Sequence, residues 1–381
     1  MNRITLNMMI CCLLAAVCTG LSSCAHDEDP TADDVNPQAL YVAFRLTTSV
    51  VSGPSATSRG SAPDNTDKGA WGDGYSSSET IEFEEKILKD KFHVVFYDSG
   101  DNSYVGCLDN ILCTELTQSG AGGIYTFHGE LKLEQTGMTV EQLRQKSVKM
   151  MVIANMPDVT GEMLKNGLSD NGLGHLTYNY IGQEGDFQAV PMWGVASPDL
   201  SAITPGKTLN LGTVSLLRAM AKVEVCVNRA DPNLNNVNVK SMTVNRANIS
   251  GYGLPGNWNN VGQTTDLKFA ETLRIPDNAV PVNYTFAKAD DQGAIIFYMP
   301  ECRNNSGDDE IILTVTYTVD SDERKGTIRL CPYANGRPDN GGELWDIVRN
   351  HHYRYEITSI GVIKFRVSVH EWTIVEKDIN M

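Results

Sequence analysis

Several short stretches carry residue types that could bind a phosphate group or a metal ion. Pro205–Thr208 reads Pro-Gly-Lys-Thr, as at the end of a phosphate-binding loop, but Ser201 stands where the first glycine of that loop is required. Asp231–Asn236 begins like a calcium-binding loop, yet Met242 occupies the position that needs a bidentate glutamate. Both stretches lack a required residue, so we predict neither a cofactor nor a metal site there.

Patterns for nucleophilic and zinc-dependent hydrolysis are incomplete as well. A nucleophile elbow needs a glycine two residues before its serine, and Asn248 holds that position. None of the seven histidines is spaced as His-Glu-x-x-His, and His370-Glu371 stands alone. His351 and His352 are adjacent, so on a strand they would point to opposite faces. We predict no catalytic residue and no enzyme; a hydrolase whose triad is assembled in space stays an alternative.

Length and charge restrict the class of protein. The chain has 381 residues, which favours two domains at roughly 100–200 residues each. Its formal net charge is -16, and this balance opposes binding to nucleic acid phosphates or to anionic lipids. Hydrophobic residues make up 41% of the chain, which is enough to form buried cores. We therefore expect a folded, acidic protein that does not bind nucleic acid.

Residues 1–24 have the pattern of an export signal. Arg3 supplies a basic start, and Met8–Val17 is apolar but too short to span a bilayer. The stretch ends in Leu-Ser-Ser-Cys, which resembles a bacterial lipobox and predicts that Cys24 carries acyl chains such as palmitate. An ordinary cleavable signal with a chance cysteine is the alternative. The residues after Cys24 are acidic and interrupted by proline, as expected of a tether.

The other cysteines define no site. Those beyond the signal and Cys24 are Cys107, Cys113, Cys226, Cys302 and Cys331. An odd number cannot form a complete disulfide framework, and no spacing matches a metal site. A Cys107–Cys113 disulfide and buried thiols are both open interpretations.

Strand patterns dominate from Leu40 onward. Short alternating segments are separated by clusters of Gly, Asn, Asp and Pro, which is typical of β-sandwiches. Val42, Phe44, Leu46 and Val50 share one face of the first segment, Leu40–Val50. The pattern predicts an all-β chain with two modules of similar size.

Three further segments organise the chain. Thr139 and Gln142 have the spacing of a capping box at the start of a short helix. The helix leads into Val148–Met156, a continuous apolar run suited to a strand buried on both faces. Residues 228–237 look like a loop or domain boundary, and Asp320–Arg324 predicts a hairpin turn.

A small, polar stretch, Ser52–Gly69, follows the first strand and contains one arginine, Arg59. Proteolytic nicking concentrates in exposed, flexible segments of this composition. Arg59 is therefore the better processing candidate, and Arg45, inside the predicted strand, is the poorer one.

Aromatic residues lie in or beside Gly- and Asn-rich loops. Such rings could stack on sugars in a glycan-binding module, or they could plug the ends of the sandwiches. We favour the second interpretation. The residues are Trp71, Tyr75, Tyr252, Trp258 and Trp345.

A series of segments together resembles the fimbrillins of Bacteroidales-type (type V) pili, in the order in which that family carries them. The resemblance covers most of the chain after Cys24. The segments are the first strand and its arginine (Leu40–Gly60), two core strands (Val94–Gly100, Val148–Val159), a Pro-Met-x-Gly segment (Val190–Val195), an Arg-x-x-Ala-Lys strand (Leu216–Val225), a Tyr-x-Pro-Glu segment (Ile295–Glu301) and the Arg-Asn and terminal strands (Val348–Ile379).

The resemblance implies two transthyretin-like Greek-key β-sandwich domains in tandem. We place them at residues 60–228 and 229–381, after the tether, first strand and processing linker in residues 25–59. It also implies an outer-membrane lipoprotein that is built into an extracellular fimbrium and supports adhesion, with no cofactor. The alternative is a lipid-anchored surface protein that binds a glycan or a host protein.

The family also implies a mechanism of assembly. A trypsin-like, Arg-specific protease would cut between Arg59 and Gly60, and the strand carrying Val42, Phe44 and Leu46 would leave. A strand from another fimbrial subunit would replace it by donor-strand exchange. The predicted donor residues are Phe365, Val367, Val369, Trp372 and Ile374; alternatively these form the last strands of their own domain.

One departure from the family concerns the segment before the terminal strand. Shaft fimbrillins can carry a long proline-rich insertion there, whereas Glu356–Val367 connects directly in this chain. The sequence therefore leaves shaft, accessory, tip and anchor subunits as alternatives.

Overall fold

We analysed a computed structural model of the chain. It describes residues 36–48, 83–84, 86–115, 125–133, 137–167, 172–183, 185–267, 272–277, 279–287, 294–334, 337–338, 343–360 and 363–371. These residues are nearly all β, which confirms the predicted class. The short helices are α3 (Val140–Arg144) and α4 (Gly161–Asn166), with the 3-10 turns η1 (Lys89–Lys91), η2 (Leu173–His175), η3 (Pro232–Leu234), η4 (Trp258–Asn260), η5 (Thr264–Asp266) and η6 (Gly307–Asp309).

The capping box predicted before α3 is confirmed. The Thr139 hydroxyl accepts a hydrogen bond from the Gln142 backbone N–H at 3.2 Å. The Gln142 side-chain oxygen accepts one in return from the Thr139 backbone N–H at 2.8 Å. Two backbone donors at the start of the helix are thereby satisfied, which fixes where α3 begins.

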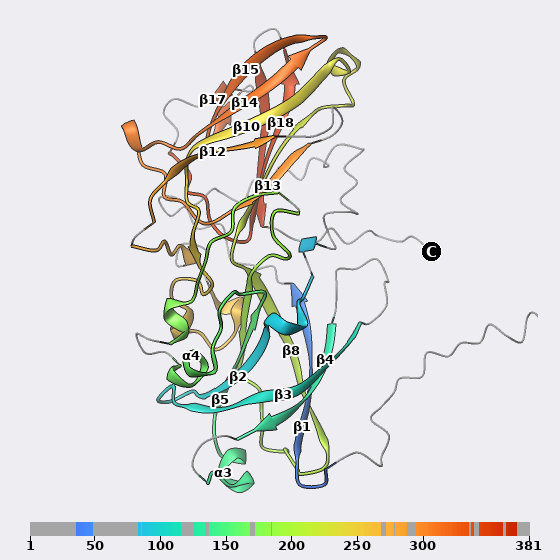
Figure 1. The fold of residues 1–381 in the computed structure, drawn as a ribbon, viewed down its shortest axis with the longest axis vertical. Helices are drawn as coiled ribbons and strands as arrows, with labels where there is room; N and C mark the ends of the chain where they lie inside the picture. Colours follow the sequence, from blue (N-terminus) through green and yellow to red (C-terminus); the bar gives the residue numbers. More distant parts are fainter. Residues whose placement is uncertain are drawn as a thin grey trace, which may run out of the picture.

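The first half of the molecule, residues 36–218, forms a closed seven-stranded sheet within the described residues (Figure 1). Its inner face packs into one hydrophobic cluster. Around the sheet the order is β1 (Leu40–Thr48), β4 (Tyr125–Lys132), β3 (Tyr104–Glu115), β2 (Phe92–Asp98), β5 (Val148–Ala154), β7 (Met192–Ala196) and β8 (Thr208–Arg218).

One side of this closed sheet is buried on both faces. In β5, Met150 and Val152 point into the sheet, whereas Met151 and Ile153 point outward into a second cluster. This explains why Val148–Met156 is continuously apolar, as the sequence predicted. The second cluster includes Tyr298 of the other half, so it fills the junction between the halves.

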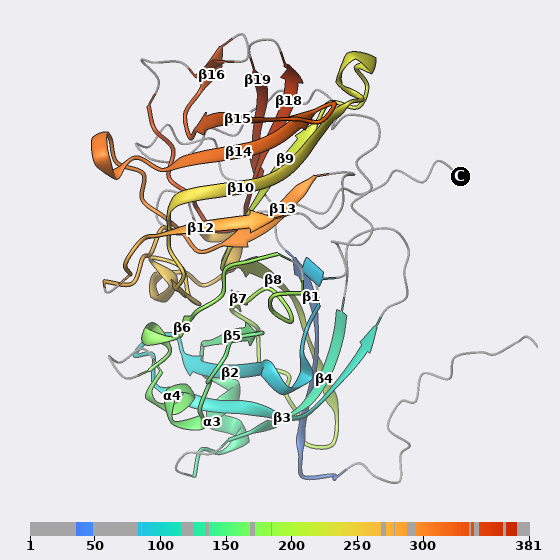
Figure 2. The same ribbon diagram turned by 45° about the horizontal axis from the view of Figure 1, so that its top comes forward.

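The second half, residues 221–371, is a sandwich of two four-stranded sheets around a third cluster (Figure 2). One sheet has the order β12 (Val282–Ala287), β10 (Val237–Ala247), β14 (Ile312–Val319), β15 (Asp322–Arg329), and the other β13 (Ile295–Met299), β9 (Ala221–Val227), β18 (His351–Ser359), β19 (Lys364–Glu371). The predicted hairpin forms between β14 and β15, with Val319 opposite Asp322.

Two small sheets complete the described structure. β6 (Thr177–Tyr178) pairs with β11 (Gly251–Tyr252) and so connects the two halves. β16 (Tyr333–Ala334) pairs with β17 (Arg337–Pro338).

The chain passes from the closed sheet to the sandwich between β8 and β9. β9 forms its ladders with β13 and β18, both in the second half. The division at residue 228 stays a prediction, because sheet pairing alone does not define an independently folding unit.

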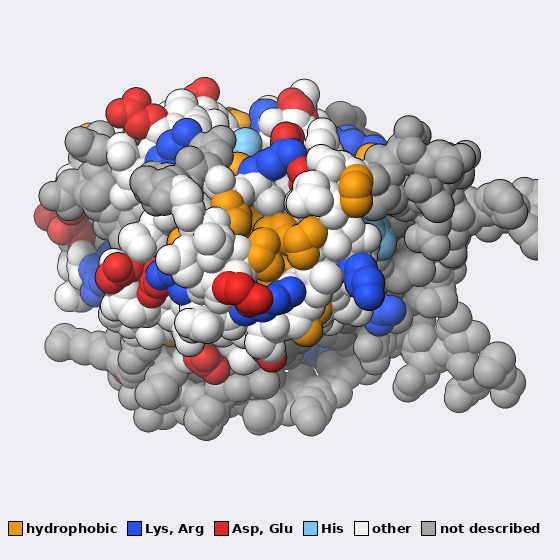
Figure 3. Space-filling model, turned by 90° about the horizontal axis from the view of Figure 1, so that it is seen from below, with side chains coloured by type: hydrophobic (Ala, Val, Ile, Leu, Met, Phe, Trp, Pro, Cys, Tyr) orange, Lys and Arg blue, Asp and Glu red, His pale blue; other side chains and the backbone are white. Residues whose placement is uncertain are grey.

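The lower end of the molecule belongs to the closed sheet and α3. Figure 3 shows this end with hydrophobic side chains gathered near its centre and charged side chains of both signs around them.

Candidate functional site

The strand β1 closes the sheet of the first half. It pairs with β4 in the antiparallel direction, with Phe44 opposite Phe127. On its other side it pairs in parallel with β8, with Leu46 opposite Val214. β1 is the element between β4 and β8 in the closed order. Its backbone therefore satisfies the edge N–H and C=O groups of two other strands.

The inward side chains that the structure describes in β1 are apolar. Leu40, Val42, Phe44 and Leu46 are at most 5% exposed and belong to the core of the closed sheet. Arg45 points outward and is exposed. Burial of each large apolar side chain stabilises the fold by roughly 1.5–3 kcal/mol. The structure thus places Val42, Phe44 and Leu46 on one face, as their alternation predicted.

The described residues on either side of 49–82 lie near the C-terminal end of β8. Thr48 lies opposite Leu216 in the parallel ladder. Two residues along β8, Arg218 donates a hydrogen bond from Nε to the Glu84 backbone oxygen at 3.1 Å. The predicted cleavage residues Arg59 and Gly60 lie outside the described residues, as does Cys24.

A buried carboxylate fixes the chain just after this segment. Glu84 Oε1 accepts hydrogen bonds from Lys222 Nζ at 2.5 Å and from the Tyr298 hydroxyl at 2.9 Å. Both side chains of the ion pair are at most 5% exposed. Phe83 packs against Phe187 and Tyr298, with ring centroids 5.2 Å apart in each case. The two residues therefore tie the chain to the junction between the halves.

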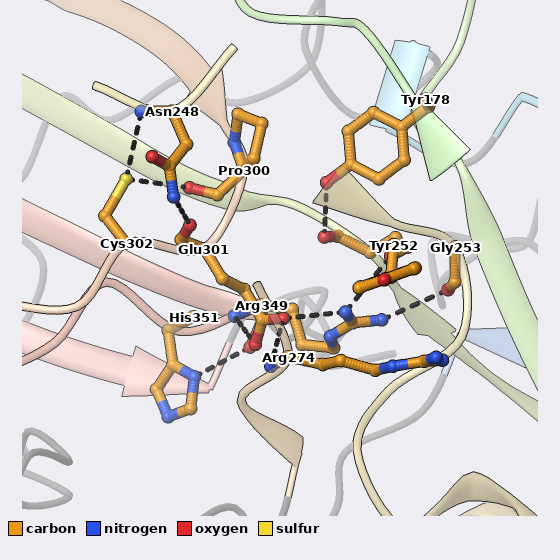
Figure 4. A network of polar contacts seen from close by, with 11 residues as sticks. Tyr178, Asn248, Tyr252, Gly253, Arg274, Pro300, Glu301, Cys302, Arg349 and His351 are labelled. Atoms are coloured by element: carbon orange, nitrogen blue, oxygen red, sulfur yellow. Dashed lines mark hydrogen bonds and ion pairs between the residues drawn. The ribbon is translucent and has the colours of Figure 1, made fainter. Parts of the chain in front are cut away.

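A second ion pair lies in the same junction (Figure 4). Arg349 Nη2 is 2.7 Å from Glu301 Oε2, and both side chains are at most 2% exposed. The Arg349 guanidinium also donates to the backbone oxygens of Gly253 and Tyr252, each at 3.1 Å. Arg274 stacks over the Tyr252 ring at 3.9 Å. These contacts connect β11 to the segment that precedes β18.

Segments that carry the fimbrillin resemblance meet here. The Arg218 backbone N–H donates to Asn350 Oδ1 at 3.4 Å, and the Asn350 backbone N–H donates to the Met220 oxygen at 2.8 Å. Ala219 donates its backbone N–H to the Pro191 oxygen at 2.8 Å. The Arg-x-x-Ala-Lys, Pro-Met-x-Gly, Pro-Glu and Arg-Asn segments thus share one buried network. Most of its donors and acceptors pair with one another, whereas Arg349 Nε has no hydrogen-bond partner among the described residues. This pairing suits a structural role.

The glycine of the Pro-Met-x-Gly segment permits a close approach. A Cβ atom at Gly194 would lie 2.5 Å from the Ser215 backbone oxygen of β8. Any larger residue would therefore push β7 away from β8.

A row of charged side chains continues on the outer face of β9 and β18. His352 Nε2 is 2.9 Å from Glu224 Oε2, and Arg354 Nε is 3.3 Å from Glu224 Oε1. Burial lowers the pKa of His352, although the hydrogen bond to Glu224 opposes this shift. Burial raises the pKa of the Glu224 carboxyl, but His352, Arg354 and Lys222 outweigh it and leave that pKa below its usual value.

His351, His352 and the loop at Asp231 make contacts within the fold. His351 Nδ1 lies 2.9 Å from the Arg349 oxygen, a different partner from that of His352. Asp231 Oδ1 accepts the Asn233 backbone N–H at 2.9 Å and so caps η3. Within the described part of the chain, no group of three or more His, Cys, Asp or Glu side chains is placed to hold a metal ion.

Two aromatic residues of the sugar-binding alternative are buried. Trp258 and Trp345 are each 7% exposed, and Trp258 belongs to the junction cluster. Trp71 and Tyr75 lie outside the described residues. Cys107 and Cys113 lie on the same strand, β3, and no disulfide joins them.

The predicted donor residues are divided by the structure. Phe365 and Val367 of β19 are at most 8% exposed in the core of their own sandwich. Val369 lies opposite Tyr353 in the ladder between β19 and β18. Trp372 and Ile374 lie outside the described residues.

The buried ion pairs at the junction were not predicted from the sequence. Glu84, Glu301 and Arg349 are far apart in the chain, so no local pattern joins them. A usable signal was present in β9, because Lys222 and Glu224 interrupt a strand that is otherwise apolar and buried.

Comparisons with known proteins found structural likeness only. No family model matches the chain, and no curated protein matches it. A fimbrial assembly protein from Parabacteroides distasonis matches with 14% identity and a TM-score of 0.47, over 87% of this chain and 98% of that one. A putative cell adhesion protein from Bacteroides eggerthii matches with 12% identity and a TM-score of 0.42, over 89% and 97%.

A third structure, the fimbrial anchor protein Mfa2 from Porphyromonas gingivalis, matches with 12% identity and a TM-score of 0.31, over 90% of this chain and 100% of that one. The described residues include no helix that is long and apolar enough to span a membrane. The structural neighbours are thus fimbrial assembly, cell adhesion and fimbrial anchor proteins, at TM-scores that assign neither a family nor a function to this chain.

Proposed function

We propose that this chain is a structural subunit of a cell-surface fimbria and that β1 is the element replaced during assembly. The observation that carries the proposal is the position of β1. It joins β4 to β8, and the inward side chains that the structure describes, Leu40, Val42, Phe44 and Leu46, are apolar. A strand of this kind can be exchanged for another with the same alternation without leaving a buried charge.

Removal of β1 would create a site for another subunit. The facing edges of β4 and β8 would carry unpaired backbone groups beside an open hydrophobic groove, which favours strand addition. A strand donated by one subunit to the next makes a head-to-tail contact that does not close on itself. Repetition of that contact gives a filament.

Processing acts on residues 49–82 in this proposal. A flexible tether of that length has a root-mean-square span of about 30 Å. It would hold a displaced β1 near the groove between β4 and β8 at an effective concentration of about 1 mM, so β1 would rebind. A cut between Arg59 and Gly60 by a trypsin-like protease would remove this advantage and let β1 leave.

Export and anchoring precede this step. We propose that the chain leaves the cytoplasm with its lipid on Cys24 and stays at the outer membrane until processing removes the tether and β1. Its mature part would be two transthyretin-like Greek-key domains, at residues 60–228 and 229–381, and its partners would be other fimbrial subunits.

The donor would be the terminal segment of a neighbouring subunit. Of the predicted residues, Phe365, Val367 and Val369 take part in β19, where Phe365 and Val367 fill the core of their own sandwich. We therefore assign the donated side chains to Trp372 and Ile374.

The test is the N-terminal sequence and lipid status of the protein recovered from cells. We expect a mature chain that begins at Gly60 and high-mass polymer in the wild type. In Arg59→Ala the lipid should remain on Cys24 and the polymer should disappear.

Arg45→Ala is the matched control, because Arg45 is an exposed arginine of the same N-terminal region. It should be processed like the wild type. A mature protein that keeps its lipid and forms the same polymer with or without Arg59 would contradict the proposal and favour an anchored surface protein.

A further inference from the structure

Three stacked rings cross the core of the closed sheet, and β1 supplies one of them. The Phe44 and Phe127 centroids are 5.5 Å apart with an interplanar angle of 14°. Phe127 stacks in turn on Phe92 of β2, at 4.5 Å and 21°. Phe44 is 1% exposed and Phe127 is 2% exposed. Removal of β1 would therefore take away one member of a buried aromatic stack.

The other neighbour of β1 is irregular at the same position. Ala43 lies opposite Asn210 of β8, whereas Arg45 lies opposite Thr213, so β8 has a bulge facing Phe44. The bulge includes Gly212, whose φ of 82° lies in the left-handed region. Phe127 on one side and the bulge on the other therefore mark a single position along β1.

These two features fix the register of any strand that pairs with β4 and β8 in the place of β1. A shift by two residues would keep the same face inward, but it would set an aliphatic side chain on Phe127 and move the ring away from the bulge. Close-packed cores do not tolerate such a change of shape without loss of stability.

We infer that the groove between β4 and β8, which β1 fills, selects the replacing strand by one aromatic side chain at the position of Phe44. We call this side chain the aromatic key. The inference rests on the proposed exchange of β1 and names the chemistry of the partner. The incoming segment is an extended strand of another subunit that runs parallel to β8. It carries an aromatic side chain at the position facing Phe127 and aliphatic side chains two residues before and after it, as Val42 and Leu46 flank Phe44.

Within the predicted donor segment near the C-terminus, two stretches approach the pattern. Ile363, Phe365 and Val367 match it, but β19 buries the last two of these in its own sandwich. Trp372 and Ile374 supply the ring and the aliphatic residue that follows it, with His370 in the preceding position.

Strand replacement in the full chain, cut after Arg59 with an Arg-specific protease, tests the inference. The probe is a fluorescent synthetic peptide of residues 39–48, added in excess, and its incorporation is measured by size-exclusion chromatography. We expect the wild-type and Arg45→Ala peptides to bind alike. The Phe44→Ala peptide should bind at least a hundredfold more weakly, because it leaves a cavity beside Phe127.

A second variant separates the ring stack from general hydrophobicity. In a chain with Phe127→Leu, the preference for Phe44 over a Phe44→Leu peptide should fall by about tenfold, because the stacking partner is gone. Equal binding of the Phe44→Ala and wild-type peptides overturns the aromatic key while strand exchange stands. Failure of every peptide to bind the cut chain overturns both the exchange and the key.

Discussion

Residues 49–82 connect two regions that are held in different ways. At one end β1 lies in the closed sheet with Leu40, Val42, Phe44 and Leu46 turned inward. At the other end Glu84 lies in the junction, where it neutralises Lys222. An apolar strand contributes through shape and area, so a similar strand can take its place. A buried charge depends on one opposite charge in one geometry, so its partner cannot be exchanged.

The largest expected effect is at the junction. Glu301→Gln removes the charge that balances Arg349, whose side chain is 1% exposed, and leaves a buried guanidinium uncompensated. We expect the free energy of unfolding to fall by about 4 kcal/mol. Chemical denaturation measures this directly.

Glu141→Gln is the matched control for that variant. Glu141 pairs with Arg144 on α3, but its side chain is 73% exposed. Exposed pairs of this kind contribute about 0.5 kcal/mol. Similar losses in the two variants would remove the contrast between buried and exposed charges.

An intermediate effect is expected at Leu46 of β1, an aliphatic position where the volume of the side chain matters more than its identity. Leu46→Ala should lower the free energy of unfolding by about 2–3 kcal/mol, because Leu46 is 1% exposed in the core. Leu46→Met, which keeps the volume, should cost less than about 1.5 kcal/mol. Denaturant titrations of the two variants give the comparison. If methionine costs as much as alanine, the groove that β1 fills does not accept another strand with side chains of similar volume.

The smallest expected effect depends on pH. Burial keeps the pKa of His352 below its usual value of 6.5, so the folded chain stays unprotonated there while the unfolded chain takes up a proton below that pH. Stability is therefore present above about pH 6.5 and declines as the pH falls. We expect a loss of about 1 kcal/mol between pH 7 and pH 5.5 that His352→Gln lacks.

Hydrogen exchange at pH 7 and pH 5.5 would locate this loss of stability in the structure. His352 of β18 contacts Glu224 of β9, so protection should fall first in these two strands. The inward residues of β1 carry no titratable group. Equal loss of protection in β1 at pH 5.5 would argue that the two regions respond as one.

The sequence was sufficient for the parts of the fold with a local cause. Alternation placed Val42, Phe44 and Leu46 on one face, and the capping box placed the start of α3. A long apolar run predicted that β5 is buried on both faces, which holds because two clusters flank it.

The parts with a distant cause could not be predicted. Tyr298 and Lys222, both from the other half, contact Glu84. No sequence pattern near Glu84 predicts these two contacts. The closure of the first sheet is of the same kind, because β1 and β8 are among the most widely separated strands of that half. The cleavage and lipidation residues stay predictions.

The parallel ladder between β1 and β8 has a consequence for the order of folding. β1 is made first, but the strand it must pair with, Thr208–Arg218, is made much later. Closing such a long loop costs more entropy than forming the β3–β4 hairpin, so we expect β1 to dock after that hairpin. Amides of β1 that gain protection during refolding before those of β3 and β4 would contradict this order. Departure of β1 would then reverse a late step of folding and leave the earlier contacts in place.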